Sequence, residues 1–460
     1  MSTIRLLQTA FEYVKKRDYD EAKKLLYGII NLAKDNSDVY HLLAIIELET
    51  NNFDKSIDYF KKGYSLNPVN DYFYLNYGIA LIKNNDYAKA IEILTIAVKR
   101  KDNFDEAKFN LGNAFKFIKN YKLAINIYNE ILNNSPFKSL SLNNMGLCYY
   151  SMNDIDQSIN LYNDAIKLND KFYEAYSNKG NSLFSKGKYL EALNEYDNSL
   201  LINPNYSLAL ANKGITLQKL QLYEEAIIQF KAALKINPNL SNISIALAAL
   251  EQKNIPTIAP QNYVEELFDR YADNFDDDLI NQLNYKSPKL LYQRYQKLSN
   301  NSNINILDLG CGTGLCGEEF KKISNKLIGV DLSTEMLKKA AHRQIYSELI
   351  QSDICDYMKN SNTKFELILC ADVLVYMGDL SSFFSLIKKC LNNNGVCLFT
   401  IESSQSNTFE LKNSQRYGHS LEYISSLTLN NNLTLIDSIK SVLRNDKGVG
   451  VEGYIVTVMN

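Results

Sequence analysis

The sequence predicts an α-solenoid followed by an α/β domain with a doubly wound, Rossmann-like sheet of seven strands. The first observation behind this prediction is a unit that begins at Thr3 and recurs every 34 residues as far as residue 240. The second is an apolar run, Ile306–Leu309, that leads into glycines at alternate positions from Gly310 to Gly314. Repeated helical hairpins stack into a solenoid, and an apolar strand that turns through glycines into a helix is typical of a nucleotide site on a parallel sheet.

Seven units of this length match the period of the tetratricopeptide repeat (TPR), and they form the predicted first domain, residues 1–240. The eighth position of each unit is alanine or glycine and the twentieth is alanine or serine, so the two helices of a unit can cross closely. The twenty-fourth position takes a bulky residue, such as Tyr128 or Tyr162, which we expect to fill the space between neighbouring units. The units begin at Thr3, Ser37, Asp71, Asp105, Ser139, Tyr173 and Ser207.

A column of asparagines occupies the sixth position of the later units. Their amides can donate to and accept from the backbone of an extended peptide, and the column resembles the asparagine ladder in the TPR region of protein O-GlcNAc transferases. This resemblance implies a protein or peptide partner in the groove of the solenoid. The alternative is that the amides only pack and hydrogen-bond between units. The asparagines are Asn76, Asn110, Asn144, Asn178 and Asn212.

Residues 241–261 connect the repeats to the second domain. The apolar stripe of Ser241–Lys253 predicts one more helix, which would cap the last repeat. Two prolines, Pro256 and Pro260, then break the helical pattern. We therefore expect a short, stiff linker with few contacts, and a second domain, residues 262–460, that folds by itself.

Two nucleotides compete for the glycine turn. The segment Gly312–Gly317 satisfies the pattern G-x-G-x-x-G of dinucleotide-binding loops, so NAD is one candidate. Three features favour S-adenosylmethionine (SAM). An acid, Asp308, precedes the first glycine, the segment Asp331–Ala340 is similar to that of class I methyltransferases, and a further acid, Asp353, follows a third apolar run.

The chain from about Tyr263 to its end resembles the predicted TPR-containing class I methyltransferases of bacteria, which are similar to the Williams-Beuren region methyltransferase-like proteins. The resemblance implies a seven-stranded sheet whose last two strands, Leu435–Leu443 and Gly450–Val458, form an antiparallel pair. It brings no methyl acceptor with it. The segments that carry the resemblance are Phe268–Asp276, Asp308–Gly317, Ala371–Tyr376 and Ser414–Ser420.

On this resemblance, the methionine part of SAM would lie along the glycine turn. The backbone of Gly310 and Gly312 would pass beside it, and Gly314 would complete the turn. Asp308 would steer the loop and the amino group of the cofactor.

The nucleoside part of SAM would lie along the ends of the next two strands. Asp331 would accept hydrogen bonds from the ribose hydroxyls. Met336 would lie against the adenine, and Asp353 with the amide of Ile354 would hold its edge. Tyr271 would lie in a helix that covers the cofactor, or would belong to the core.

Few catalytic side chains are expected, because methyl transfer from a sulfonium is an in-line displacement in which the protein mainly aligns the acceptor and excludes water. Asp372 follows the fourth predicted strand, and it either faces the methyl group or caps the next helix. Tyr417 and His419 form a polar cluster with Arg416 at a position that commonly borders the acceptor. His419 could act as a base or orient the acceptor, or it could be structural.

Composition argues against several other classes of protein. The net charge of −2 gives no basic excess, so no nucleic-acid partner is expected. The first residues are typical of an amphipathic helix and not of a signal peptide, and no apolar run reaches the roughly 20 residues that span a bilayer. The seven cysteines lack zinc-ligand spacing, so no metal is expected, and they indicate the reduced thiols of a cytoplasmic protein.

Three functions remain open at this point. The favoured hypothesis is a SAM-dependent methyltransferase whose repeats recruit a protein or peptide. The second is a small-molecule methyltransferase that uses its repeats for assembly, and the third is a TPR scaffold whose nucleotide-binding domain is not catalytic. The intact glycine turn and the acids Asp331, Asp353 and Asp372 argue against the third.

Overall fold

The computed structural model describes residues 3–32, 36–131, 133–273, 275–279, 283, 285–299, 301–446 and 448–460. Two compact units make up the chain, Met1–Leu222 and Tyr223–Asn460. The division falls between α13 (Ser207–Lys219) and α14 (Tyr223–Ile236), which are the two helices of the seventh predicted repeat. The predicted division at residue 240 follows the repeat period, whereas contacts group α14 with the C-terminal unit.

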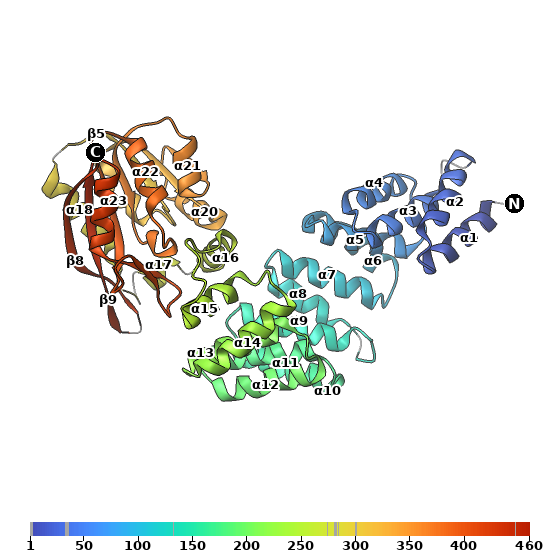
Figure 1. The fold of residues 1–460 in the computed structure, drawn as a ribbon. Coiled ribbons are helices and arrows are strands. Elements are labelled where there is room, and N and C mark those ends of the chain that lie inside the picture. The colour runs from blue at the N-terminus through green and yellow to red at the C-terminus, as the bar shows by residue number, and fades with distance from the viewer. Residues whose placement is uncertain are drawn as a thin grey trace. The chain divides into compact units, whose positions relative to one another are not determined.

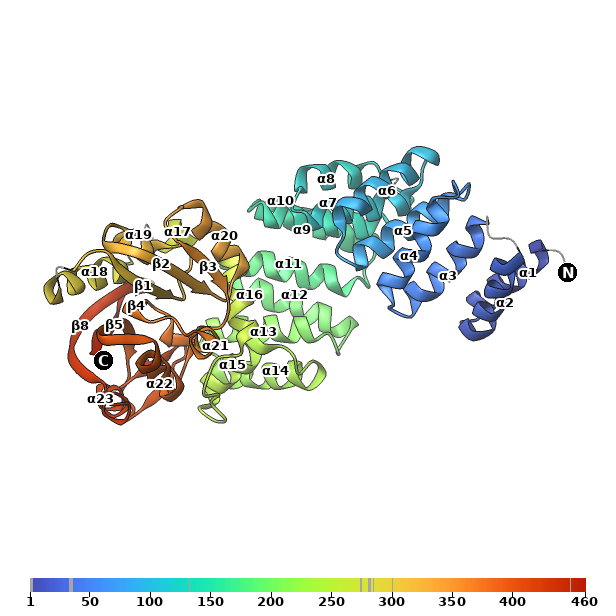
Figure 2. The ribbon, with the colours of Figure 1, turned by 90° about the horizontal axis from the view of Figure 1, so that it is seen from above.

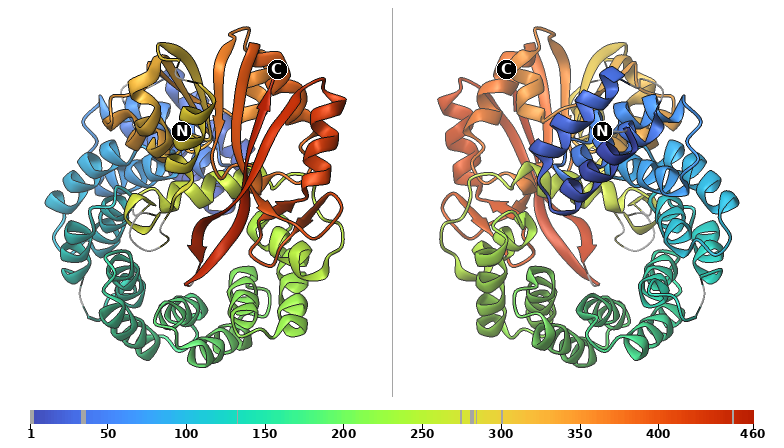
Figure 3. Two further views of the ribbon diagram at one scale, coloured as in Figure 1. Left: turned by 90° about the vertical axis from the view of Figure 1, so that its left-hand side faces the viewer. Right: turned by 90° about the vertical axis from the view of Figure 1, so that its right-hand side faces the viewer.

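Antiparallel pairs of helices build the N-terminal unit (Figure 1, Figure 2). In Figure 3 these pairs, coloured from blue to green, follow one another along a curved row. The first helix of each repeat begins at its predicted residue, except that α9 begins one residue early, at Lys138. The predicted solenoid is therefore confirmed. Its helices are α1 (Thr3–Lys15), α2 (Tyr19–Leu32), α3 (Ser37–Glu49), α4 (Phe53–Tyr64), α5 (Asp71–Lys83), α6 (Tyr87–Arg100), α7 (Asp105–Phe117), α8 (Tyr121–Asn129), α9 (Lys138–Ser151), α10 (Ile155–Leu168), α11 (Tyr173–Ser185), α12 (Tyr189–Ile202) and α13.

A contact between the eighth and twenty-fourth positions joins the two helices of a repeat. A Cβ atom added at Gly112 would lie 2.5 Å from Cε1 of Tyr128, so the ring leaves no room for a larger residue. Gly146 faces Tyr162 in the same way. The hydroxyl of Tyr128 also accepts from Asn144 of the next repeat, at 3.5 Å. The bulky residue thus packs within its own repeat as well as toward the neighbouring one.

A twisted sheet forms the centre of the C-terminal unit. Within the described residues it has nine strands, in the order β3-β2-β1-β4-β5-β7-β6, and β9 pairs with both β5 and β8. The first five strands are parallel, and β8 and β9 form the predicted antiparallel pair. The two strands beyond the predicted seven are β6 and β7, a short hairpin past the end of β5. The strands are β1 (Ile304–Leu309), β2 (Ser324–Asp331), β3 (Glu348–Gln351), β4 (Phe365–Cys370), β5 (Leu391–Ser403), β6 (Phe409–Leu411), β7 (Tyr417–His419), β8 (Thr434–Asp446) and β9 (Val449–Met459).

Helices cover both faces of this sheet. Alternate residues of β1 point to opposite faces, so Leu307 packs with α21, α22 and α23 while Ile306 packs with α18 and α19. The two apolar layers leave the carboxyl ends of the parallel strands at one edge, where a ligand site is expected. The helices are α16 (Gln261–Tyr271), α17 (Phe275–Asp277), α18 (Ser287–Leu298), α19 (Leu315–Phe320), α20 (Thr334–His342), α21 (Ile354–Asn360), α22 (Ser381–Cys390) and α23 (Leu421–Asn430), with 3-10 turns η2 (Lys321–Ile323) and η3 (Leu374–Tyr376).

The predicted capping helix, α15 (Ser241–Glu251), packs on the α/β domain as well as on α14. Its Ile245 and Ala249 belong to one buried cluster with Tyr376 and Tyr417. The following linker is tied to the same domain, since the backbone amide of Ala259 donates to Tyr376 O at 2.9 Å. The expectation of a linker with few contacts is wrong, because α15 and the linker bury apolar side chains of the α/β domain, among them Tyr376 and Tyr417.

Candidate active site

A cavity of about 460 Å³ opens at the carboxyl edge of the parallel strands. This volume lies in the range of roughly 300–1,000 Å³ that is typical of sites for small ligands. Predicted residues from four successive strand ends lie on its wall: Gly310 and Gly312 after β1, Asp331 at the end of β2, Asp353 and Ile354 after β3, and Asp372 after β4. The structure thus brings together six of the predicted residues, which the sequence spreads over some sixty positions.

The glycine turn after β1 adopts a backbone conformation that suits glycine. Gly310, Gly312 and Gly314 have φ angles of 65°, 54° and 93°, all in the left-handed region. A Cβ atom at Gly310 would also lie 2.2 Å from Cγ2 of Val373. The turn therefore keeps its backbone against the cavity at Gly310 and Gly312. Gly314 lies off the wall, at the N-terminus of α19, so its predicted contact with a cofactor is not supported.

Two carboxylates on the wall are oriented by backbone amides. Asp331 accepts from the amide of Gly312 at 2.8 Å and from that of Ser333 at 2.9 Å. Burial raises the pKa of Asp331, and these amide bonds oppose the rise. Asp353 caps α21 and accepts from the amide of Cys355 at 2.8 Å. Each carboxylate oxygen has two lone pairs, so both groups retain acceptor capacity toward the cavity.

Asp308 lies beneath the glycine turn and not on the cavity wall. Its side chain is 1% exposed and accepts from the hydroxyl of Tyr346 at 2.7 Å. The predicted contact with the amino group of a cofactor is therefore not supported. Burial raises the pKa of Asp308 from 3.8 to about 7, and the bond from Tyr346 opposes part of that rise.

This raised pKa predicts a pH-dependent cost to stability that Asp308→Asn removes. The folded protein holds a proton on Asp308 between pH 4 and 7 that the unfolded chain has already lost, so stability falls as the pH rises through this window. We expect the variant to gain in melting temperature relative to the native protein between pH 5 and pH 8. Asp446→Asn, at an exposed position, is the control and should show no such trend. A difference in melting temperature between variant and native protein that stays constant with pH would contradict the raised pKa of Asp308.

Helices α16 and α17 cover the cavity. Two acidic side chains of the segment Phe268–Asp276 hold them in place by hydrogen bonds. Asp269 accepts from the hydroxyl of Ser333 at 2.5 Å, and Asp276 accepts from that of Thr313 at 2.5 Å. Phe268 and Phe275 line the cavity. These contacts tie the two helices to the loops after β1 and β2. Asn274 of the same segment lies outside the described residues.

Two predicted cofactor contacts lie away from the cavity wall. Tyr271 does not line the cavity, and its ring packs against Phe275 with a centroid distance of 5.6 Å. Met336 is fully buried within the first turn of α20. The apolar part of the wall near Asp331 comes from Leu332 and Ile354 instead.

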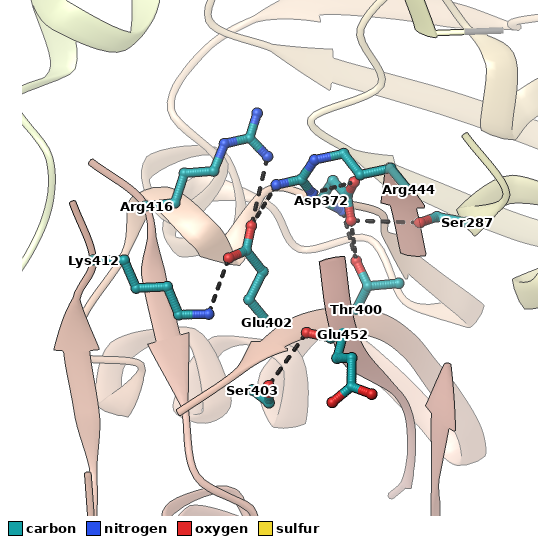
Figure 4. Close-up of polar contacts among 9 residues, drawn as sticks. All are labelled: Ser287, Asp372, Thr400, Glu402, Ser403, Lys412, Arg416, Arg444 and Glu452. Atoms are coloured by element: carbon teal, nitrogen blue, oxygen red, sulfur yellow. Dashed lines mark hydrogen bonds and ion pairs between the residues drawn. The ribbon is translucent and has the colours of Figure 1, made fainter. Parts of the chain in front are cut away.

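Asp372 is held in a strained conformation at the end of β4. Its φ angle of 56° is unusual for a residue other than glycine, and such strain is often kept at functional sites. Its carboxylate accepts from Thr400 at 2.8 Å and from Arg444 at 3.3 Å (Figure 4). The following turn, η3, has no side-chain cap, so Asp372 is not the helix cap that the sequence also allowed.

The structure contradicts the prediction that Tyr417 and His419 are catalytic. Neither lines the cavity, and both are fully buried. The hydroxyl of Tyr417 donates to Pro256 O at 2.6 Å, and Nε2 of His419 lies 2.8 Å from Met377 O. Burial lowers the pKa of His419 to about 4, so the ring is neutral at pH 7. Both side chains hold the β6–β7 hairpin in place.

Arg416, Arg444 and Tyr285 also lie on the cavity wall, and the sequence singled out neither Arg444 nor Tyr285. Arg416 was assigned to the polar cluster, but no role was given to it. Arg444 lies in β8, and nothing in the local pattern distinguishes it from a surface residue of a strand. Only the fold brings it to Asp372, which lies 72 residues earlier in the chain.

The asparagine column of the repeats donates to neighbouring protein groups. Nδ2 of Asn144 donates to Asn113 at 2.8 Å, and Nδ2 of Asn212 donates to Asn181 at 2.9 Å, in each case in the preceding repeat. Asn178 makes a similar bond to the preceding repeat, Asn110 bonds within its own helix, and Asn76 lies 3.1 Å from the ring of His41. All five side chains are half-buried. These contacts favour the packing interpretation, while the second amide N–H and the oxygen keep capacity for a ligand.

The seven cysteines are free thiols, and all but Cys355 are buried. No group of three or more His, Cys, Asp or Glu side chains in the described part of the chain could hold a metal ion. Among the same residues, no helix has the length and apolar character needed to cross a membrane.

Family models match both parts of the chain. A model described as a methyltransferase domain matches residues 300–445. Two models described as tetratricopeptide repeats match residues 75–139 and 143–207, and residues 37–70 and 208–240. The chain thus combines TPR repeats with a methyltransferase domain. The narrower likeness to the Williams-Beuren region proteins stays a prediction.

The individual proteins that are similar to the chain include O-methyltransferases. The ubiquinone biosynthesis O-methyltransferase of Bartonella quintana (strain Toulouse) is 29% identical over 97 residues, which are 20% of this chain and 39% of that protein. The malonyl-[acyl-carrier protein] O-methyltransferase of Hamiltonella defensa is 28% identical over 95 residues, which are 21% of this chain and 36% of that protein. The chain therefore spans less than half the length of these relatives. A solved magnesium protoporphyrin IX methyltransferase from Synechocystis PCC 6803 superposes with a TM-score of 0.36 at 13% identity, over 44% of this chain and 96% of that one.

Proposed function

We propose that this protein is a SAM-dependent methyltransferase whose TPR repeats bind a protein or peptide. The observation that carries the proposal is the cavity at the carboxyl edge of the sheet. It combines backbone at Gly310 and Gly312 with the carboxylates of Asp331, Asp353 and Asp372. This set of groups suits a nucleoside joined to an amino acid, since hydroxyls and amino groups donate to carboxylates.

Different residues on the wall suit the methionine chain, the ribose and the adenine of SAM. The glycine backbone leaves room for the methionine chain at Gly312, where even an added Cβ atom would meet only the ring of Phe275, at 3.7 Å across the cavity wall. Asp331 would accept from the ribose hydroxyls. Asp353, already fixed as a helix cap, would accept from the adenine amino group beside the apolar Ile354.

When bound, SAM supplies an electrophilic methyl group on its sulfonium. The protein then needs to align an acceptor with it and to exclude water. Phe268 and Phe275 close the cavity on the side of α16 and α17. Of the predicted catalytic residues, Asp372 lies on the cavity wall. Its bonds to Thr400 and Arg444 fix the direction of its carboxylate. We therefore assign to Asp372 the role of orienting the acceptor. Oxygen is the acceptor atom that the two O-methyltransferase relatives support.

A test of the repeats separates a protein acceptor from a small molecule. Changing Asn110, Asn144, Asn178 and Asn212 to alanine should weaken capture of a protein substrate about tenfold or more, if each amide contributes about 0.5–1.5 kcal/mol. The measurement is transfer of tritiated methyl from SAM into proteins and small molecules of a cell lysate, with native and variant protein. A loss of protein labelling at low substrate that disappears at saturating substrate supports a docking groove.

The control separates docking from folding. Three of the four amides bond to the preceding repeat, so the melting temperature of the variant must be measured alongside. Asn126 and Asn160, which are exposed on second helices, serve as a matched pair of asparagine-to-alanine changes. Labelling that is unchanged in a folded quadruple variant, or that enters only small molecules, would show that the column is structural and favour the small-molecule alternative.

A further inference from the structure

Two carboxylates and three cations meet on the side of the cavity beyond β4 (Figure 4). Glu402, at the end of β5, is 2% exposed and accepts from Nη2 of Arg444 at 2.5 Å and from Nζ of Lys412 at 3.2 Å. Asp372 accepts from Nη1 of Arg444 at 3.3 Å. Arg444 thus forms ion pairs with both carboxylates, and Lys412 forms a second one with Glu402.

The third cation, Arg416, has no carboxylate of its own. Its Nη1 lies 3.7 Å from the same oxygen of Glu402 that Arg444 binds, and its guanidinium lies over the ring of Tyr376, 5.7 Å from the centroid. Within the described chain its guanidinium donates no hydrogen bond. Its side chain is 29% exposed and lies on the cavity wall. The five charged side chains therefore carry one positive charge in excess, and the guanidinium of Arg416 has N–H donors that bond to no group of the described chain.

The position of Arg416 in the sheet separates it from the cofactor end of the cavity. Arg416 directly precedes β7, and the strand order β1-β4-β5-β7 places β7 three strands from the glycine turn after β1. Neighbouring strands lie about 4.8 Å apart, so this separation is about 14 Å along the sheet. Arg416 is thus on the side that remains for the acceptor when a nucleoside occupies the ends of β1 to β3.

Beside these charged groups, the cavity wall also carries aromatic and aliphatic side chains. Tyr376 is 7% exposed and packs edge-on against Phe268, with ring centroids 5.5 Å apart. Ile258, Ala259 and Val264 line the same cavity. An anion bound by Arg416 would lie next to aromatic and aliphatic groups. A ligand that fits this part of the cavity would therefore have an anionic group, which binds the charged donor, and an apolar body, which packs against the wall.

We infer that Arg416 binds a carboxylate of the methyl acceptor, and that the acceptor carries this group on an apolar or aromatic body. The inference rests on the proposed function, since it assigns this side of the cavity to the acceptor. A guanidinium can donate two parallel hydrogen bonds to a carboxylate. One negative charge balances the three cations and two carboxylates, whereas a phosphate monoester would add nearly two charges.

The test asks whether the full-length protein, loaded with S-adenosylhomocysteine (SAH), prefers 4-fluorobenzoate to 4-fluorobenzamide in fluorine NMR titrations. The two probes share a ring and differ in charge, and we expect the benzoate to bind about tenfold or more tightly. Arg416→Gln should abolish this preference. Arg416→Lys should keep part of it, because lysine keeps the charge but lacks the planar fork. Arg270→Gln, whose side chain is 71% exposed, is the matched control and should change nothing.

Cofactor affinity is measured on the same proteins with SAH and with 5′-methylthioadenosine, which lacks the carboxylate. Lost probe preference with unchanged SAH affinity supports the inference. If Arg416→Gln weakens SAH but not methylthioadenosine, Arg416 binds the cofactor's carboxylate; the inference then fails while the proposed function stands. Equal binding of the two probes to the native protein also overturns it, without any variant. If the native protein binds no SAH, the proposed function fails and the inference fails with it.

Discussion

A chain that begins at Asn262 is expected to unfold at a much lower urea concentration than one that begins at Tyr223. The shorter chain lacks α15, whose Ile245 and Ala249 cover Tyr376 and Tyr417 in a buried cluster. It also lacks the linker, whose Thr257 O accepts from two backbone amides of the loop after η3, at 2.8 and 2.9 Å. Lost apolar burial and lost hydrogen bonds together should cost at least about 3 kcal/mol.

Circular dichroism is the probe for this comparison, because the chain has no tryptophan. A third chain that begins at Ser241 is the control. It lacks α14 but keeps α15 and the linker, so it should resemble the longest chain. If all three unfold at the same urea concentration, the contacts of α15 and the linker do not stabilise the domain. The original expectation of an independent domain from residue 262 would then hold.

Arg444→Met is expected to lower the free energy of unfolding by about 3–5 kcal/mol at neutral pH, because it leaves two carboxylates without their main partner in a buried site. Arg444 is 6% exposed and donates to both Asp372 and Glu402. Methionine keeps much of the length of the side chain but none of its charge. Lys440→Met on the same strand, which breaks an exposed ion pair with Glu452, is the control and should leave the urea midpoint unchanged.

The effect of Arg444→Met should depend on pH. Burial alone would raise the pKa of Glu402, but the attraction of Arg444, Arg416 and Lys412 more than offsets it, so this pKa lies below its ordinary value. The stability that Glu402 contributes is present above its ordinary pKa and is lost as the pH falls through the lowered one. The gap between native protein and variant should therefore narrow in acid. A gap that does not change with pH would mean that Arg444 stabilises only by packing.

Features that depend on neighbouring residues in the chain could be predicted from the sequence. The repeat period located the first helices of the repeats to within one residue, since each hairpin packs on the next in the same way. The glycine turn and the acids that end apolar runs were also predictable. The carboxyl ends of parallel strands lie at one edge of the sheet, however the helices pack on its faces. The residues that follow these strands therefore meet at that edge, namely Gly310, Asp331, Asp353 and Asp372.

Features that depend on contacts between distant segments could not be predicted. Tyr417 and His419 had the residue types of an acceptor site, yet Tyr417 is fixed by Pro256, 161 residues away, and His419 by Met377, 42 residues away. The pattern of apolar residues in α15 predicted a buried face but not which surfaces would cover it. The same holds for Arg444, whose strand pattern gives no sign of its two carboxylate partners.

Calorimetry of the full chain with SAH and with NAD tests the central claim, a SAM site at the carboxyl edge of the sheet, most directly. We predict micromolar binding of SAH, roughly 7–9 kcal/mol, and weaker or no binding of NAD. Asp331→Ala should lose about 1–3 kcal/mol of this affinity, since it removes a charged acceptor for the ribose hydroxyls, while Glu422→Ala at an exposed site should lose none. Binding of NAD in preference to SAH, or SAH affinity that is unchanged by Asp331→Ala, would contradict the account.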